Sequence, residues 1–183
     1  MIEFYFDYAS PWSYLASALI PKHFPNVKIV YRPIYLRGLE MFSKGLPYSA
    51  HKLRYIGADL LRCAEHEKIP IRIPTNFPVN GLYAVRGALA ALEANTFDAY
   101  HARMFRAAWL EDRDIGNKSV VQELAPGLDI EAAALKEKLK RDTAEAESRG
   151  VFGVPAFFAG DEMFRGHDRM EYVARAIKGR QRT

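Results

Sequence analysis

The side chain best placed to do chemistry is Ser10, which stands between a predicted strand and a predicted helix. Residues 2–6 are mostly apolar and aromatic, which favours a buried strand. Ser10 and Pro11 then form a helix start, because serine caps free N–H groups and proline suits the first helical position. The backbone N–H groups at such a tip can hold an anion. On this pattern alone, a purely structural helix cap is the commoner role for Ser10.

The elements that position Ser10 form a strand, a helix and a second strand. The first helix is predicted to end near residues 24–26, and residues 27–31 alternate like a strand that Arg32-Pro33 ends. Strand, helix and strand within some thirty residues is the size of a βαβ unit. We therefore expect the first two strands to be parallel.

The C-terminal part is predicted to supply a hairpin and a last helix. Residues 154–159 and 162–165 read as its two strands, and Asp168 is a plausible N-cap for a helix over 169–178. Between the two ends of the chain, the sequence predicts helices near residues 49–67, 81–94, 96–111, 117–125 and 129–149.

The composition fits a soluble globular chain. With 183 residues, 49% of them hydrophobic and 26% charged, the chain can bury a sizeable core. The net charge of +4 permits anionic ligands. The one dense basic run, residues 178–182, is better explained as a solvated tail than as a nucleic-acid-binding arm. Without a signal-peptide pattern or a long apolar run, we expect a cytoplasmic protein that does not contact membranes.

Cysteine and histidine give no sign of a disulfide framework or a metal site. The single cysteine, Cys63, excludes an intramolecular disulfide and suits a reducing compartment, and its place within a predicted helix suggests a small core residue. The histidines lack the spacing of metal ligands, so no metal site is expected.

Several motifs, in order along the chain, carry a resemblance to a known family. Phe4-Tyr5-Phe6-Asp7 and Ser10 to Ala16 resemble the opening of 2-hydroxychromene-2-carboxylate isomerases, and are similar to the related kappa-class glutathione transferases of the DsbA-like thioredoxin superfamily. Oxidoreductases of that superfamily have Cys-x-x-Cys where this chain has Ser10-Pro11-Trp12-Ser13, so the dithiol chemistry is absent. The other matching motifs begin at Lys52, Phe77, Ala108, Gly150 and Gly166.

Together, the layout and the resemblance imply an α/β thioredoxin-like fold (βαβ … ββα) with a large all-helical insertion. We expect residues 1–37 and 150–183 to form the two parts of the thioredoxin-like domain. Residues 38–149 would be the inserted helical domain, packed over the tip of the first helix.

The resemblance also implies a glutathione site. The sulfur would lie at Ser10, the catalytic residue, and Val154 before a cis Pro155 would pair with the cysteinyl backbone. Asp168 would receive the γ-glutamyl ammonium, although on sequence alone it is more often just a cap. His167 and Lys52 would contact ligand ends, although an exposed turn histidine and a solvated lysine explain them nearly as well. Trp12 and Ser13 are assigned to the substrate pocket.

The chemistry implied for this site requires an ionised thiol. A thiol with a pKa of about 8.5 is only about 3% ionised at pH 7, and moving that pKa to roughly 6.5 takes about 2.7 kcal/mol. A helix N-terminus supplies about 0.3–1 kcal/mol. A hydrogen bond from the Ser10 hydroxyl to a charged sulfur adds about 1.5–3 kcal/mol. The helix dipole alone falls short, so the hydroxyl must contribute.

Three departures from the family pattern bear on ligand and substrate range. Gly81 stands where Ser or Thr is usual, and Lys44-Gly45-Leu46-Pro47 replaces a Gly-Asn-x-Pro loop, so an asparagine that contacts glutathione is missing. His167 stands where a small polar residue is more usual.

These observations predict a glutathione-dependent isomerase for an aromatic acid, and two neighbouring classes stay open. In the isomerase, the thiolate attacks an electron-poor carbon, a bond rotates, and glutathione leaves unchanged. A kappa-like glutathione transferase would instead consume glutathione. The second alternative is a non-catalytic thioredoxin-like binding module or a disulfide oxidoreductase relative, and Ser10 and Ser13 argue against the oxidoreductase. The resemblance also implies a possible homodimer.

Overall fold

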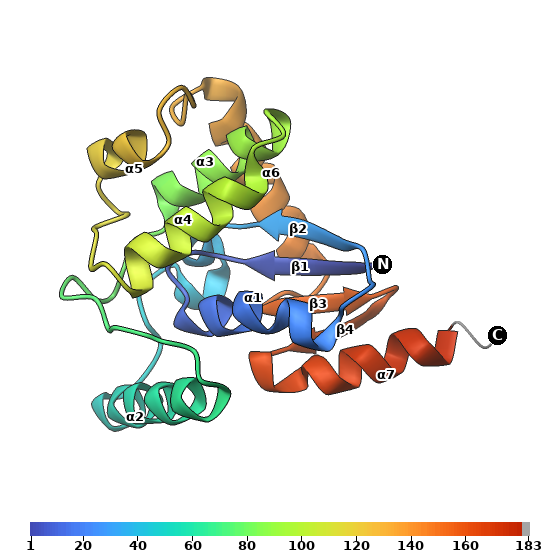
Figure 1. Cartoon of the computed structure of the whole chain (residues 1–183). Helices are drawn as coiled ribbons and strands as arrows, with labels where there is room; N and C mark the ends of the chain where they lie inside the picture. Colours follow the sequence, from blue (N-terminus) through green and yellow to red (C-terminus); the bar gives the residue numbers. More distant parts are fainter. Residues whose placement is uncertain (181–183) are drawn as a thin grey trace.

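The fold is built on a four-stranded mixed sheet with the order β2-β1-β3-β4 (Figure 1). A computed structural model describes residues 1–180. Strand β1 (Ile2–Phe6) is parallel to β2 (Ile29–Pro33) and antiparallel to β3 (Ala156–Ala159), which pairs with β4 (Glu162–Arg165). The α/β thioredoxin-like fold predicted from the sequence is therefore confirmed.

Along the chain, one helix follows β1, another follows β4, and the remaining helices lie between β2 and β3. Helix α1 (Pro11–His23) follows β1, and α7 (Met170–Arg180) follows β4 after the short 3₁₀ helix η3 (His167–Arg169). The intervening elements are η1 (Leu36–Gly38), η2 (Glu40–Phe42), α2 (Ala50–Glu67), α3 (Leu82–Glu93), α4 (Phe97–Trp109), α5 (Lys118–Leu124) and α6 (Ala133–Ser148).

Four sequence-based assignments were wrong. Strand β3 begins at Ala156 rather than residue 154, because its pairing with β4 begins at Ala156↔Arg165. Strand β2 begins at Ile29 rather than residue 27 and continues through Pro33, because its register is set by pairing with β1 from Ile2↔Ile29 to Phe6↔Pro33. Proline is tolerated there because β2 is an edge strand. Helix α6 begins four residues later than predicted, at Ala133. Asp168 is not a helix N-cap, because it lies inside η3, where no side-chain capping bond forms.

The alternation of side chains along the strands divides the buried residues into two clusters. Phe4 and Phe6 of β1 and Phe157 of β3 face a large core that includes residues of α1, α3, α4 and α7. Tyr5 and Phe158 face a smaller cluster with residues of η2 and the end of α6. Both faces of the sheet are covered, so β1 is held between two buried clusters. The turn between β1 and α1 therefore begins from a well-packed strand.

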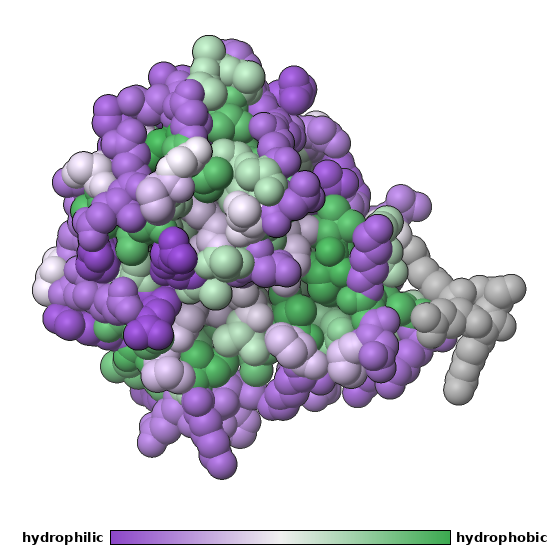
Figure 2. Space-filling model, turned by 45° about the horizontal axis from the view of Figure 1, so that its top comes forward, coloured by the Kyte–Doolittle hydropathy of each residue, from purple (hydrophilic) through white to green (hydrophobic). Residues whose placement is uncertain are grey.

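Helix α2 stands apart from the rest of the helices, at the lower left of Figure 1. Only Leu60 and Ala64 of its residues are buried. On the face seen in Figure 2, hydrophilic residues predominate and hydrophobic ones appear in several patches between them. Within residues 1–180, no helix is both long and apolar enough to cross a membrane. Of the basic run at the C-terminus, residues 181 and 182 lie outside the described part.

Candidate active site

The tip of α1 holds Ser10 by backbone bonds on both sides. Its N–H donates to the Asp7 carbonyl at 3.0 Å, and its carbonyl accepts from Tyr14 N–H at 3.1 Å. The Ser10 Oγ accepts from Ser13 N–H at 3.1 Å, which is the capping bond expected of this residue. Within the described chain, the Trp12 N–H at this tip has no protein acceptor. Ser10 thus lies beside a free donor at the positive end of a helix.

The loop before β3 meets this tip. The Val154–Pro155 peptide bond is cis, as predicted from the resemblance, and a second cis bond joins Phe77 and Pro78. The Ser10 hydroxyl donates to the Val154 carbonyl at 3.4 Å. A hydroxyl bond is usually about 2.7–2.8 Å long, so this one is weak and easily exchanged for a better acceptor.

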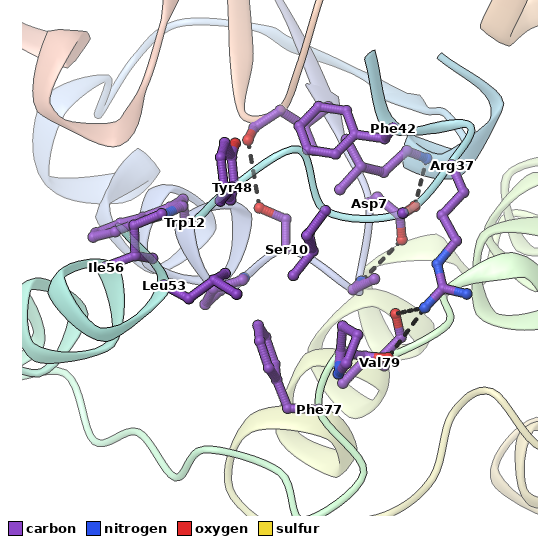
Figure 3. A pocket seen from close by; sticks show the side chains of 18 of the residues that line it. Asp7, Ser10, Trp12, Arg37, Phe42, Tyr48, Leu53, Ile56, Phe77 and Val79 are labelled. Atoms are coloured by element: carbon purple, nitrogen blue, oxygen red, sulfur yellow. Dashed lines mark hydrogen bonds between the residues drawn. The ribbon is translucent and has the colours of Figure 1, made fainter. Parts of the chain in front are cut away.

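A central cavity of about 290 Å³ opens in front of Ser10 (Figure 3). In Figure 3 the Ser10 side chain lies between Trp12 on one side and Asp7 and Arg37 on the other, with Phe77 and Val79 across the space. The lining is mostly apolar, and helix α2 contributes Leu53 and Ile56 to it. Such a cavity suits the flat apolar body of a small molecule.

A lateral cavity of about 240 Å³ adjoins the central one, with Trp12, Tyr48, Ile56, Val154 and Arg165 bordering both. The residues that border the lateral cavity alone include four predicted glutathione contacts, which are Lys52, Pro155, His167 and Asp168. Side chains far apart in the sequence are therefore brought to two neighbouring cavities, and Ser10 lines the central one.

Trp12 and His167 join the α1 tip to η3 across this space. Their rings stack with centroids 4.9 Å apart and planes 14° from parallel. Burial lowers the pKa of His167, although Asp168 beside it acts in the opposite direction. The imidazole is therefore a neutral, stacked part of the site at neutral pH, a role that the sequence did not reveal.

The two predicted charged contacts are exposed and only loosely engaged. Asp168 pairs with Arg169 at 3.1 Å, with more than half of each side chain exposed. An exposed pair of this kind contributes about 0–1 kcal/mol, so Asp168 can exchange it for another cation. The ammonium of Lys52 lies 4.3 Å from the centroid of the Tyr48 ring, which holds it at the cavity edge.

Ser13 does not line either cavity, which departs from its predicted place in the substrate pocket. Its side chain is fully buried, and its Oγ has no hydrogen-bond partner within the described chain. Ser13 is the third residue of α1, and its side chain points into the core. Its N–H donates to the Ser10 Oγ and so orients that hydroxyl. Ser13 therefore acts on the site through its backbone.

Asp7 is a buried carboxyl beside the site that sequence reasoning missed. It is fully buried, and it accepts from Ala9 N–H at 2.9 Å and from Leu36 N–H at 2.7 Å. Burial raises its pKa to about 6, against the effect of these two amides. Its position directly after β1 and three residues before a helix cap was the available signal.

Asp7 fills the space beside Gly81, one of the departures from the family pattern. A Cβ placed on Gly81 would lie 1.9 Å from the Asp7 Oδ1, so the carboxyl occupies the volume that a Ser or Thr side chain would need. Gly45, the other departure, lines the central cavity with a φ of +104° and offers no side chain to a ligand.

Two further polar groups, His101 and Cys63, line neither the central nor the lateral cavity. His101 bonds to the Tyr8 hydroxyl at 3.1 Å and to the Ser17 hydroxyl at 2.8 Å, and burial lowers its pKa to about 3. Cys63 is half-buried against the core, and burial raises the pKa of its thiol. Within residues 1–180, no group of three or more His, Cys, Asp or Glu side chains could hold a metal ion.

Comparison with known proteins defines the class. The family described as DSBA-like thioredoxin domain matches residues 1–178. The 2-hydroxychromene-2-carboxylate isomerase of Pseudomonas sp. (strain C18) is 32% identical over 98% of this chain and 91% of its own. A solved 2-hydroxychromene-2-carboxylate isomerase structure has a TM-score of 0.79 and 30% identity, covering 98% of this chain and 95% of its own.

The chain belongs to the 2-hydroxychromene-2-carboxylate isomerase family within the DsbA-like thioredoxin superfamily. It is also similar to glutathione S-transferase kappa 1 of Rattus norvegicus, at 24% identity over 95% of this chain and 89% of that protein. Its named relatives are thus isomerases and glutathione transferases.

Proposed function

We propose that the protein is a glutathione-dependent isomerase that acts on an aromatic acid such as 2-hydroxychromene-2-carboxylate. The observation that carries the proposal is the Ser10 hydroxyl, fixed at a helix N-terminus and aimed into a mostly apolar cavity. The names of the relatives support the same activity.

The residues of this chain fit a thiol tripeptide. The Ser10 Oγ is oriented by Ser13 N–H, and its proton is held only by a 3.4 Å bond to Val154. A sulfur anion is a stronger acceptor than that distant carbonyl, so the hydroxyl would turn to it. The free Trp12 N–H would add a second donor to the same anion. Together with the helix dipole, these donors supply the roughly 2.7 kcal/mol that lowers a thiol pKa to about 6.5.

Recognition of the rest of the tripeptide falls to the lateral cavity. Asp168 would take the γ-glutamyl ammonium in exchange for Arg169, and the neutral His167 would donate at the same end. Lys52 would attract a carboxylate from the α2 side, and the Val154 backbone would pair with the cysteinyl residue.

Bound glutathione would supply a sulfur nucleophile that adds to an electron-poor carbon and leaves again, so that it is regenerated. The role of the protein would be to hold that sulfur through Ser10 in both steps and to keep the apolar body of the substrate in the central cavity. Trp12, which borders both cavities, would lie between the two ligands. The single thiol, Cys63, suits the reducing cytoplasm in which we expect this reaction to take place.

A second candidate is a kappa-like glutathione transferase, which the relative from Rattus norvegicus favours. The same serine would activate the sulfur, but the product would keep it. The fate of glutathione separates the two functions, because an isomerase returns it and a transferase consumes it.

The test combines calorimetry with a turnover assay. Glutathione is titrated into the wild type, Asp168→Ala and the control Asp161→Ala, whose side chain is exposed in the turn between β3 and β4. We expect about tenfold weaker binding for Asp168→Ala and unchanged binding for the control. Conversion of 2-hydroxychromene-2-carboxylate should require glutathione and leave its concentration unchanged. Absence of glutathione binding to the wild type would reject the proposal.

A further inference from the structure

Arg165 is the feature of the site that the proposed function leaves unused. It is the last residue of β4, it is exposed, and it borders both the central and the lateral cavity. Its position opposite Ala156 in the β3–β4 pair places it beside the loop that carries Val154. The guanidinium is therefore a positive charge at the entrance shared by both spaces.

The surroundings hold this guanidinium in place without neutralising it. Its Cζ lies 5.6 Å from the centroid of the Phe152 ring, and its Nη2 lies 3.4 Å from where a Cβ on Gly153 would be. Several other arginines pair with a carboxylate within 4 Å, which Arg165 does not do within residues 1–180. Examples are Arg32, Arg72, Arg113 and Arg149. Its donors remain available to a ligand.

The other charged groups of the central cavity are already engaged. Both oxygens of Asp7 accept backbone N–H bonds. The Nη2 of Arg37 donates to the carbonyl oxygens of Pro78 and Val79. Of the two arginines that line this cavity in the described structure, Arg37 uses one nitrogen in hydrogen bonds to the chain, whereas Arg165 makes no hydrogen bond or ion pair. The space therefore suits a molecule with an apolar body and one anionic group.

We propose that Arg165 is a specificity-determining residue that binds the carboxylate of the substrate, an inference that rests on the proposed function. The planar guanidinium matches a carboxylate through two parallel N–H···O bonds. The carboxylate end of a flat acid lies at Arg165, and its apolar body extends into the central cavity toward Ser10. The site then selects aromatic acids over neutral aromatic molecules of the same shape.

The experiment compares two probes of equal shape, 1-naphthoate and the neutral 1-naphthamide. Each is titrated calorimetrically, in the presence of glutathione, into the wild type, Arg165→Met and Arg175→Met. Arg175 is the matched control, because it lies on α7 with 75% of its side chain exposed. We expect the wild type and the control to prefer the acid by about tenfold. Arg165→Met should bind both probes equally and keep its affinity for the amide.

Three outcomes overturn the assignment. The first is that the wild type shows no preference for the acid, and the second is that the preference survives in Arg165→Met. The third is a loss of glutathione affinity in Arg165→Met, because the arginine would then serve a carboxylate of the tripeptide. Failure of the proposed function gives a different result, since the wild type would then bind no glutathione at all.

Discussion

At the scale of single residues, the two hydrogen bonds of the Ser10 hydroxyl are unequal. The bond that it accepts from Ser13 N–H caps α1 at 3.1 Å, whereas the bond that it donates to Val154 is 3.4 Å long. The first fixes the oxygen and the second leaves the proton free to move. A residue that is normally only a cap is thus also oriented as a donor.

The first prediction separates these two functions of Ser10. Ser10→Ala removes both, so we expect a loss of about 1 kcal/mol in the free energy of unfolding and an approximately hundredfold lower kcat/KM. Ser13→Ala is the control, because its hydroxyl is buried without a partner and its N–H is retained, so stability and activity should hold. Urea denaturation and the glutathione-dependent turnover assay measure the two effects. Equal activity of both variants would exclude Ser10 as a catalytic residue.

The second prediction concerns the pH dependence contributed by Asp7. Its pKa is about 6 in the folded protein against an ordinary 3.8, so the folded state favours the protonated form. This raised pKa stabilises the protein fully below pH 3.8, and the stabilisation is lost as the pH rises to about 6. The difference corresponds to about 3 kcal/mol.

Urea denaturation across this pH range tests the Asp7 contribution. Between pH 3.8 and 6, the free energy of unfolding of Asp7→Asn should rise with pH relative to that of the wild type, by up to about 3 kcal/mol, because the opposing contribution of Asp7 is gone. The exposed control Asp161→Asn should follow the wild type. The same slope in wild type and Asp7→Asn would contradict the prediction.

At the scale of secondary-structure elements, His101 ties α4 to two other segments of the large core. Its ring forms hydrogen bonds with Tyr8, which follows β1, and with Ser17 of α1. It also packs edge-to-face against Phe6, with ring centroids 4.8 Å apart. Burial favours the neutral form of this ring. The helix that covers the sheet is therefore held by a group that titrates in acid.

The third prediction is that this tie weakens in acid. The His101 pKa is about 3 in the folded protein against an ordinary 6.5, so its contribution is present above pH 6.5 and is lost as the pH falls toward 3. The loss reaches about 5 kcal/mol, which exceeds the opposite gain of about 3 kcal/mol from Asp7. The wild type should therefore lose stability in acid.

His101→Gln provides the comparison for this loss, since an amide bonds to hydroxyl groups at any pH. In that variant the free energy of unfolding should rise on acidification through the Asp7 window rather than fall. Thermal unfolding at a series of pH values measures the change, and a fall as large as that of the wild type would count against His101.

Most elements could be predicted from the sequence, because helix periodicity and capping signals are local. Ser10 with Pro11 began α1 as predicted, and the ends of α2 agreed within one residue. The start of β2 could not be predicted, because pairing with β1 decides its register. The same limit applies to the site. Ser10 and Val154 lie in local motifs and could be predicted, whereas Arg165 reaches the cavity only through the register of the β3–β4 pairing, which the sequence does not show.

At the scale of the whole molecule, α2 borders the site but belongs least to the core. Its residues Lys52, Leu53 and Ile56 line the cavities, whereas only Leu60 and Ala64 are buried. An element with so little buried surface opens at a lower free energy than the sheet. Ligands that contact it should therefore stabilise it.

The fourth prediction follows from this arrangement and uses native-state hydrogen exchange. Amides of α2 should exchange faster than those of β1, and saturating glutathione should slow exchange in α2 by roughly the factor by which its concentration exceeds the Kd. The core strand β1 serves as the internal control. Protection of α2 equal to that of β1 without glutathione would show that the helix is not a separate opening unit.

The stacking of Trp12 on His167 gives the molecule an optical property. The chain has two tryptophans, and the other, Trp109, is fully buried with its indole N–H bonded to the Tyr8 carbonyl at 2.9 Å. Trp109 should emit at short wavelength whatever the site contains. Trp12 borders both cavities beside an imidazole, so its emission should change when a ligand arrives. The protein thus carries its own fluorescent sensor of occupancy together with an internal reference.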